Sequence, residues 1–120
     1  MSEGTASKPP YFRFLTALAY HVFIKQGVDV AIMETGMGGS YDATNVIQRP
    51  IVCGITSLGF DHMAILGTTL AEIAWHKAGI MKVGTGSLVC DSLSAAEVVI
   101  RALLSRLGSL VSRLHKRRMR

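Results

Sequence analysis

Residues 28–57, VDVAIMETGMGGSYDATNVIQRPIVCGITS, decide the fold of this chain. The stretch opens with a short, mostly apolar run at residues 28–34 and closes with a second run at residues 51–57. Apolar runs of this length, each ending in a polar loop, are typical of buried strands in a parallel sheet. We therefore expect two strands here, separated by the glycine-rich loop TGMGGSYDATN.

Helical sequence lies on both sides of this stretch. Upstream, residues 11–26 repeat apolar side chains at helical spacing, and Gly27 is a natural stop. Downstream, Thr69 and Glu72 have the spacing of a capping box, which predicts a second helix that starts near Thr69. The upstream apolar stripe consists of Tyr11, Phe14, Leu15, Leu18, Ala19, Val22 and Phe23.

Strands that alternate with helices place the chain in the α/β class. A third, short strand is expected at residues 87–90, and an amphipathic helix at residues 94–116. Even so the sheet is small, because doubly wound domains mostly carry about five or more strands. This shortage is the first indication that the domain is incomplete.

Composition narrows the class further. The chain has 120 residues, of which 49% are hydrophobic and 18% charged, as in a globular protein. No apolar run is long enough to span a bilayer, and the N-terminus resembles neither a signal peptide nor a transit segment. Cys53 and Cys90 have no metal-site spacing, so a reducing interior is the default expectation.

The net charge of +5 is unevenly placed. Residues 101–120 hold six Arg and Lys116 with no acid, which gives +7, whereas residues 1–100 hold six bases and eight acids, which gives −2. A basic amphipathic helix can dock on nucleic acid, on an anionic membrane or on a partner protein. It can equally pack on the sheet with its arginines solvated, so there is no strong case for nucleic acid or membrane.

Polar groups follow the two expected strands. Glu34 closes the first strand, and Asp61 and His62 follow the second. Ligands bind beyond the carboxyl ends of strands in open α/β sheets, so a carboxylate and an imidazole meeting there could hold a divalent ion. The alternative is a helix cap or surface residue for Glu34, and a hydrogen-bonded structural role for His62.

Gly36, Gly38 and Gly39 allow close backbone approach to a ligand, or an ordinary turn. Their spacing is not that of GxGxxG, and no GxxxxGK[ST] occurs in the chain. Lys77 is unusual within the apolar stretch IAWHKAGI, where it either extends to solvent or does chemistry.

Three ordered motifs now resemble one family, folylpolyglutamate synthase of the Mur-ligase superfamily. They are ETGMGGSYDATNVI, ITSLGFDHMAILG and IAWHKAGI, which together with the first helix cover about 70 residues, from 11 to 82, and look like the eukaryotic enzymes. The resemblance implies an incomplete Mur-ligase-type central ATPase domain at residues 11–93, with a short parallel sheet flanked by helices. A disordered arm is expected at residues 1–10, and a basic amphipathic helix and tail at residues 94–120.

The resemblance implies an ATP-dependent, Mg²⁺-requiring ligase that adds L-glutamate to the γ-carboxylate of a tetrahydrofolate polyglutamate through an acyl phosphate. The parent enzyme is expected to be monomeric and to work in the cytoplasm, in mitochondria or in both. Its partners would be the small-molecule substrates tetrahydrofolate polyglutamate, L-glutamate and ATP.

Residue by residue, the resemblance assigns Mg²⁺ binding to Glu34 and His62 and carbamylation to Lys77, which would convert a cation into an oxygen ligand. Asp42 and Asn45, together with the three glycines, would shape the loop beside substrate and metal. Asp61 is expected to orient His62 or its loop.

The sequence departs from the family pattern in three places. The phosphate-binding loop and the C-terminal domain of the family are absent, and the match fades after Lys82. The resemblance therefore implies that this chain is inactive alone. A binding module built on the basic helix and a non-functional truncated product remain the alternatives.

Overall fold

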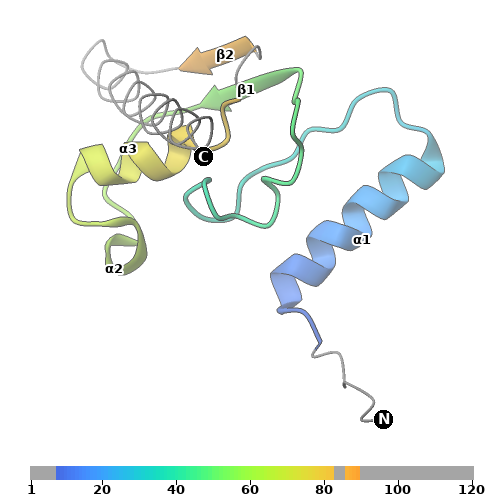
Figure 1. The fold of residues 1–120 in the computed structure, drawn as a ribbon, viewed down its shortest axis with the longest axis horizontal. Helices are drawn as coiled ribbons and strands as arrows, with labels where there is room; N and C mark the ends of the chain where they lie inside the picture. The colour runs from blue at the N-terminus through green and yellow to red at the C-terminus, as the bar shows by residue number, and fades with distance from the viewer. Residues whose placement is uncertain (1–7, 83–85, 90–120) are drawn as a thin grey trace, which may run out of the picture.

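The computed structural model describes residues 8–82 and 86–89, as three helices and two strands (Figure 1). In chain order these are α1 (Tyr11–Gln26), β1 (Val52–Ile55), α2 (Met63–Leu66), α3 (Leu70–Ala78) and β2 (Gly86–Val89). The helix expected at residues 11–26 is confirmed to its last residue. Gly27 ends it in the left-handed conformation, with φ 63°, and its N–H group donates to the carbonyls of Phe23 and Ile24.

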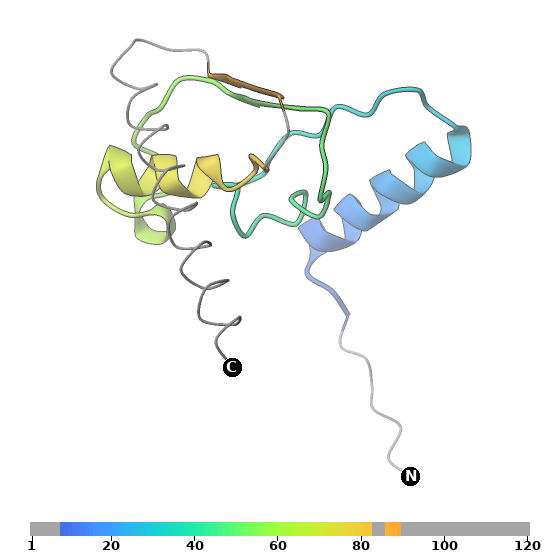
Figure 2. The same cartoon turned by 45° about the horizontal axis from the view of Figure 1, so that its top comes forward.

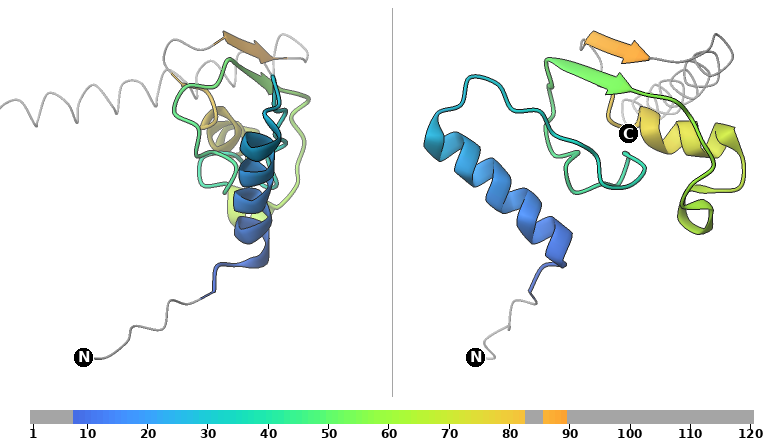
Figure 3. Two further views of the ribbon diagram at one scale, coloured as in Figure 1. Left: turned by 90° about the vertical axis from the view of Figure 1, so that its right-hand side faces the viewer. Right: turned by 180° about the vertical axis from the view of Figure 1, so that it is seen from behind.

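The apolar stripe of α1 is largely exposed among the described residues, contrary to the burial that its spacing suggests. Tyr11 is 76% exposed and Phe14 52% exposed. The buried residue is instead Thr16, whose hydroxyl donates to the Phe12 carbonyl at 2.9 Å. The side of the helix that carries Thr16 and Tyr20 faces the loop at residues 36–45, which lies between α1 and α3 in Figures 1 and 3.

Within residues 8–82 and 86–89, the sheet is parallel and has two strands. β1 pairs with β2 in a register that places Val52 opposite Gly86 and Ile55 opposite Val89. Both strands lie within one residue of, or inside, the ranges expected from sequence. The class is therefore α/β with a short parallel sheet beside helices.

The strand expected at residues 28–34 is wrong for the described part of the chain. These residues have no regular secondary structure, and Val30 and Ile32 are 68% and 92% exposed. A strand needs a neighbour to share its backbone hydrogen bonds, and this segment pairs with neither β1 nor β2. The apolar composition of residues 28–34 favours a strand, but a strand also needs a neighbouring strand to pair with.

The core lies between β1 and α3 (Figure 2). Burial alternates along β1, so Cys53 and Ile55 point inward while Val52 faces solvent. Ile55 packs with Ala74 and Ala78 of α3, and around this cluster lie Leu58, Trp75, Ile80 and Met81.

The capping box at the start of α3 is confirmed. The Thr69 hydroxyl accepts from the Glu72 N–H at 3.3 Å, and the Glu72 carboxylate accepts from the Thr69 N–H at 3.0 Å. The Thr69 hydroxyl leads the groups that lower the pKa of Glu72, followed by the N–H groups of Thr69 and Thr68. The short helix α2 was not expected from the sequence.

Three expectations concern residues outside the described ranges: most of the arm at residues 1–10, the helix at residues 94–116 and the basic tail. Within the described ranges, no helix is both long and apolar enough to cross a membrane.

Candidate functional site

The glycines of the loop lie close to its neighbours, and the backbone conformation restricts Gly38 and Gly39. Gly38 has a left-handed φ of 66°, and a Cβ on it would lie 2.8 Å from Leu66 of α2. A Cβ on Gly39, where φ is 156°, would lie 2.7 Å from the His76 carbonyl of α3. A Cβ on Gly36 would meet the ring of Phe12 at 2.5 Å. The loop is thus held in close contact with all three helices, and its approach to a ligand stays a prediction.

Asp42 organises the loop from within. Its carboxylate accepts from the Met37 N–H at 2.9 Å and from the N–H and hydroxyl of Thr44 at 2.9 and 2.6 Å. Partial burial opposes ionisation of Asp42, but these hydrogen bonds, led by the Thr44 hydroxyl, hold its pKa below the ordinary value. Asp42 is therefore a preorganised carboxylate at neutral pH.

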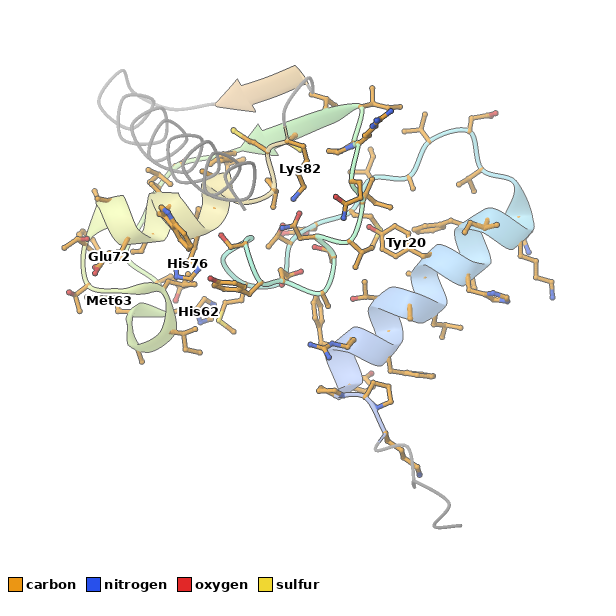
Figure 4. All side chains as sticks on the ribbon, in the orientation of Figure 1. Tyr20, His62, Met63, Glu72, His76 and Lys82 are labelled. Atoms are coloured by element: carbon orange, nitrogen blue, oxygen red, sulfur yellow. The ribbon has the colours of Figure 1, made fainter. Side chains whose placement is uncertain are left out.

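Asn45 joins the loop to the end of α3. Its side-chain NH₂ donates to the carbonyls of Ser40 and Gly79, at 3.2 and 3.1 Å. Its side-chain oxygen accepts from the Lys82 ammonium at 2.8 Å. From the opposite side, Tyr20 of α1 donates to the Thr44 carbonyl at 3.0 Å. Figure 4 shows the Tyr20 side chain extending from α1.

His62 stands in an uncommon backbone conformation. It is the non-glycine residue with positive φ (49°) among those described, and it directly precedes α2. Its N–H donates to the Asp61 carboxylate at 2.7 Å, and its Nε2 lies 3.6 Å from the other Asp61 oxygen. The structure therefore places Asp61 where it can orient His62, as expected, with both side chains open to solvent.

The candidate metal ligands offer suitable donors. Glu34 is exposed at the start of the loop, His62 is half-exposed, and Lys77 is partly buried on α3. A carboxylate and a carbamate would supply the oxygens that Mg²⁺ prefers, and the imidazole one nitrogen. Across the described ranges, no three His, Cys, Asp or Glu side chains gather as a metal-binding group. The Mg²⁺ assignment to Glu34 and His62 stays a prediction.

A pocket of about 260 Å³ opens between the start of α1, the loop, α2 and α3. Its walls are mostly apolar, with Asp42, Arg13 and His76 as polar groups. The other lining residues are Pro10, Phe12, Met37, Gly39, Tyr41, Ala43, Ile65 and Leu66. Apolar walls with a few polar groups are also found in small-molecule sites, whose volumes are usually about 300 to 1,000 Å³.

Four residues of this region were missed by sequence reasoning: Ser40, Tyr41, His76 and Lys82. Tyr41 and His76 form an edge-to-face pair with ring centroids 5.8 Å apart, and Trp75 lies 5.2 Å from His76. Ser40 donates to the His76 carbonyl. The polar and aromatic residues of SYDATN and IAWHKAGI could have marked these two segments as parts of a site. Periodicity could not show that they are in contact, because they lie about 35 residues apart in the sequence.

Comparison with known proteins gives a consistent family of relatives, although no protein-family model matches. Folylpolyglutamate synthase of Neurospora crassa is 55% identical over 95 residues, covering 79% of this chain and 18% of the relative. Mitochondrial folylpolyglutamate synthase of Homo sapiens is 58% identical over 78 residues, covering 65% of this chain and 13% of the relative. The chain thus spans less than a fifth of the length of these curated relatives.

Among solved structures, an FPGS–AMPPCP–folate complex matches with a TM-score of 0.75 and 42% identity. The match covers 82% of this chain and 24% of that one. Sequence and backbone therefore agree on the same relatives over most of the chain.

Proposed function

Since the chain belongs to the folylpolyglutamate synthase family, we propose that it is a segment of an ATP-dependent ligase that extends the glutamate tail of tetrahydrofolate. The observation that carries this proposal is the 55% identity over 95 residues, which includes the loop, His62 and Lys77. The solved FPGS–AMPPCP–folate complex, which contains an ATP analogue and folate, supports the two substrate classes.

The proposed reaction has two steps. An oxygen of the folate γ-carboxylate attacks the γ-phosphorus of ATP, which forms an acyl phosphate and releases ADP. The amine of L-glutamate then attacks the acyl carbon, the C–N bond forms, and the C–O bond to phosphate breaks as the amine loses its proton. Glu34 and His62 would hold Mg²⁺, which would offset negative charge on the phosphates.

Lys77 is proposed to act as a carbamate. Its side chain is partly buried on α3, directly after Trp75 and His76 in the sequence. Carbamylation would replace a cation by an anionic oxygen donor, which suits a hard divalent ion. Asp61 would keep the His62 imidazole oriented toward the same ion.

The pocket beside Asp42 is proposed to receive the ring system of the folate substrate. Phe12 and Tyr41 offer aromatic surfaces for a flat heterocycle. The Asp42 carboxylate lines this pocket, and ring N–H and NH₂ groups are donors of the kind that a carboxylate accepts. Affinity for the folate would then depend on Asp42, and phosphoryl transfer on Glu34.

The chain alone is proposed to be inactive. Its sequence has no GxxxxGK[ST] motif to hold a triphosphate, and positioning of the phosphates supplies most of the rate in phosphoryl transfer. The purified 120-residue chain should therefore consume no ATP in a folate- and glutamate-dependent manner. Detectable glutamylation of folate by this chain would overturn the statement.

A chimera tests the proposed site within a complete enzyme. Residues 11–82 of this chain would replace the matched segment of the Neurospora crassa relative. We expect folate-dependent glutamylation in the chimera, a loss of at least about a hundredfold in kcat for Glu34→Gln, and a rise of about tenfold in the KM for folate for Asp42→Asn.

Asp29→Asn is the matched control, because Asp29 is an exposed carboxylate upstream of Glu34 and lies outside the proposed site. Asp29→Asn should leave both kcat and the KM for folate unchanged. Equal losses for Asp29→Asn and Glu34→Gln would contradict the metal role, and an inactive chimera that is folded would contradict the proposed function.

The parent enzyme is further proposed to be a monomer of the cytoplasm, the mitochondrion or both, which sedimentation and cell fractionation would test.

A further inference from the structure

The loop and α3 approach each other closely at the C-terminal end of α3. The Ser40 N–H and hydroxyl both donate to the His76 carbonyl, at 2.8 and 3.0 Å. A Cβ on Gly39 would lie 3.0 Å from the Lys77 carbonyl, and one on Gly79 would overlap Ser40. Because the two backbones touch here, a small shift of the loop displaces the turn that carries Lys77.

Asn45 spans this junction with a single amide group. Its NH₂ donates to a carbonyl on each side, Ser40 of the loop and Gly79 of the helix end. An amide turned by 180° would instead point its oxygen at these two carbonyl oxygens, which repel it. The two carbonyls therefore favour the orientation in which the amide oxygen points away from them.

Lys82 reinforces this orientation from the other side of the amide. Its ammonium is a donor only, and it contacts the Asn45 oxygen at 2.8 Å and the Gly79 carbonyl at 3.0 Å. The cation also lies at the C-terminal end of α3, where the helix dipole favours positive charge. Both effects hold Asn45 with its NH₂ toward Ser40.

We infer that Lys82 is a positioning residue that acts through Asn45 to hold the loop at residues 39–45 against the end of α3, and so sets the place of Lys77. The hydrogen bonds of Lys82 follow from the geometry alone. Their effect on catalysis rests on the proposed function. Lys82 would not itself contact substrate.

Amide hydrogen exchange on the full 120-residue chain tests the contact. Lys82→Met keeps the apolar stem and removes the donor, and it should speed exchange of the Ser40 N–H by roughly tenfold, since hydrogen bonds to charged groups are the stronger ones. Lys82→Arg should restore most of the protection. Lys25→Met is the matched control, because Lys25 is exposed at the end of α1, and it should leave the Ser40 rate unchanged.

A second variant, Asn45→Asp, keeps an acceptor for Lys82 but removes both NH₂ donors, and it should release Ser40 as Lys82→Met does. Ser40 exchange within threefold of wild type in both variants would overturn the inference. Loss of dispersed amide signals throughout α1 and β1 would also overturn it, because Lys82 would then serve general stability.

The catalytic meaning is read separately in the chimera. Lys82→Met should lower kcat about tenfold with the KM for ATP unchanged, and Lys82→Arg should recover it, since small misplacements of reacting groups are costly. An unchanged kcat alongside faster Ser40 exchange would overturn the catalytic part alone. An inactive unsubstituted chimera would count against the proposed function, while the exchange result still decides the contact.

Discussion

The Asp42 carboxylate lies both within the hydrogen bonds of the loop and in the wall of the pocket. It accepts three hydrogen bonds from Met37 and Thr44, which order the loop, and it also lines the pocket. From the sequence, DATN indicated a loop near a ligand, and that ligand role stays a prediction. The internal hydrogen bonds could not be read from the motif, because they depend on how the loop folds back on itself.

Because the pKa of Asp42 is lowered in the folded chain, the stability of the chain should depend on pH. A carboxyl group whose folded pKa is depressed contributes stability that is complete above its ordinary value of 3.8 and is lost as pH falls through the folded value. Thr44→Val removes the 2.6 Å hydroxyl bond and should raise the pKa of Asp42 toward 3.8. An NMR titration of the Asp42 carboxyl carbon measures this shift.

Thr56→Val is the control for that titration, since Thr56 is exposed and distant in sequence from the loop. It should leave the Asp42 titration as in the wild type. A Thr44→Val curve that coincides with the wild-type curve would show that the hydroxyl is not a cause of the shift.

The attachment of helix α1 differs from what its pattern suggests. The leucines and aromatics at helical spacing predicted a helix with an apolar stripe; the helix is confirmed, and the stripe is largely exposed. In the described chain, α1 is attached through Thr16, Phe12 and Tyr20, which lie on the side that faces the loop. Periodicity reports which side chains share a face, but it does not identify the neighbour that covers that face.

Tyr20→Phe should therefore loosen α1 from the loop. The substitution leaves the Thr44 carbonyl without its 3.0 Å donor, and it should lower the free energy of unfolding by about 1 kcal/mol. Urea denaturation followed by circular dichroism measures the change. Tyr11→Phe is the matched control, because Tyr11 is 76% exposed, and similar losses in both variants would argue against the attachment.

The described molecule presents much apolar surface. Val30, Ile32 and Ile51 are each more than two-thirds exposed, on segments with the composition of strands. Extended apolar segments without pairing partners are sites of association between chains. We expect the isolated chain to aggregate as its concentration rises.

Ile32→Lys should reduce that aggregation, because a charge on an unpaired extended segment opposes pairing between chains. Light scattering at matched concentrations measures the effect. Ile24→Lys adds the same charge at a site that is 81% exposed on α1, and it should help less. If both variants reduce light scattering equally, the reduced aggregation would come from the change in net charge and not from the unpaired segment.

At the scale of the molecule, features that depend on neighbouring residues were predicted from the sequence, whereas contacts between segments far apart in the chain were not. The stop at Gly27, the capping box of Thr69 and the strand around Cys53 each depend on a few neighbouring residues. The missing strand at residues 28–34 and the contact of Ser40 with His76 depend on segments far along the chain. Of the site, the loop was foreseen, whereas the contribution of Lys82 was not.

The way α3 ends bears on the order of folding. Gly79 follows the helix with φ −65° and ψ −14°, so no left-handed residue stops it locally. The N–H groups of Gly79, Ile80 and Met81 take the carbonyls of His76, Lys77 and Ala78. Ser40 and Asn45, which lie more than thirty residues upstream, add donors to the carbonyls of His76 and Gly79, and Lys82 adds another to Gly79. Closing such a span costs chain entropy that local helix formation does not return. The end of α3 and the loop should therefore become protected together, as one cooperative unit that forms after α1.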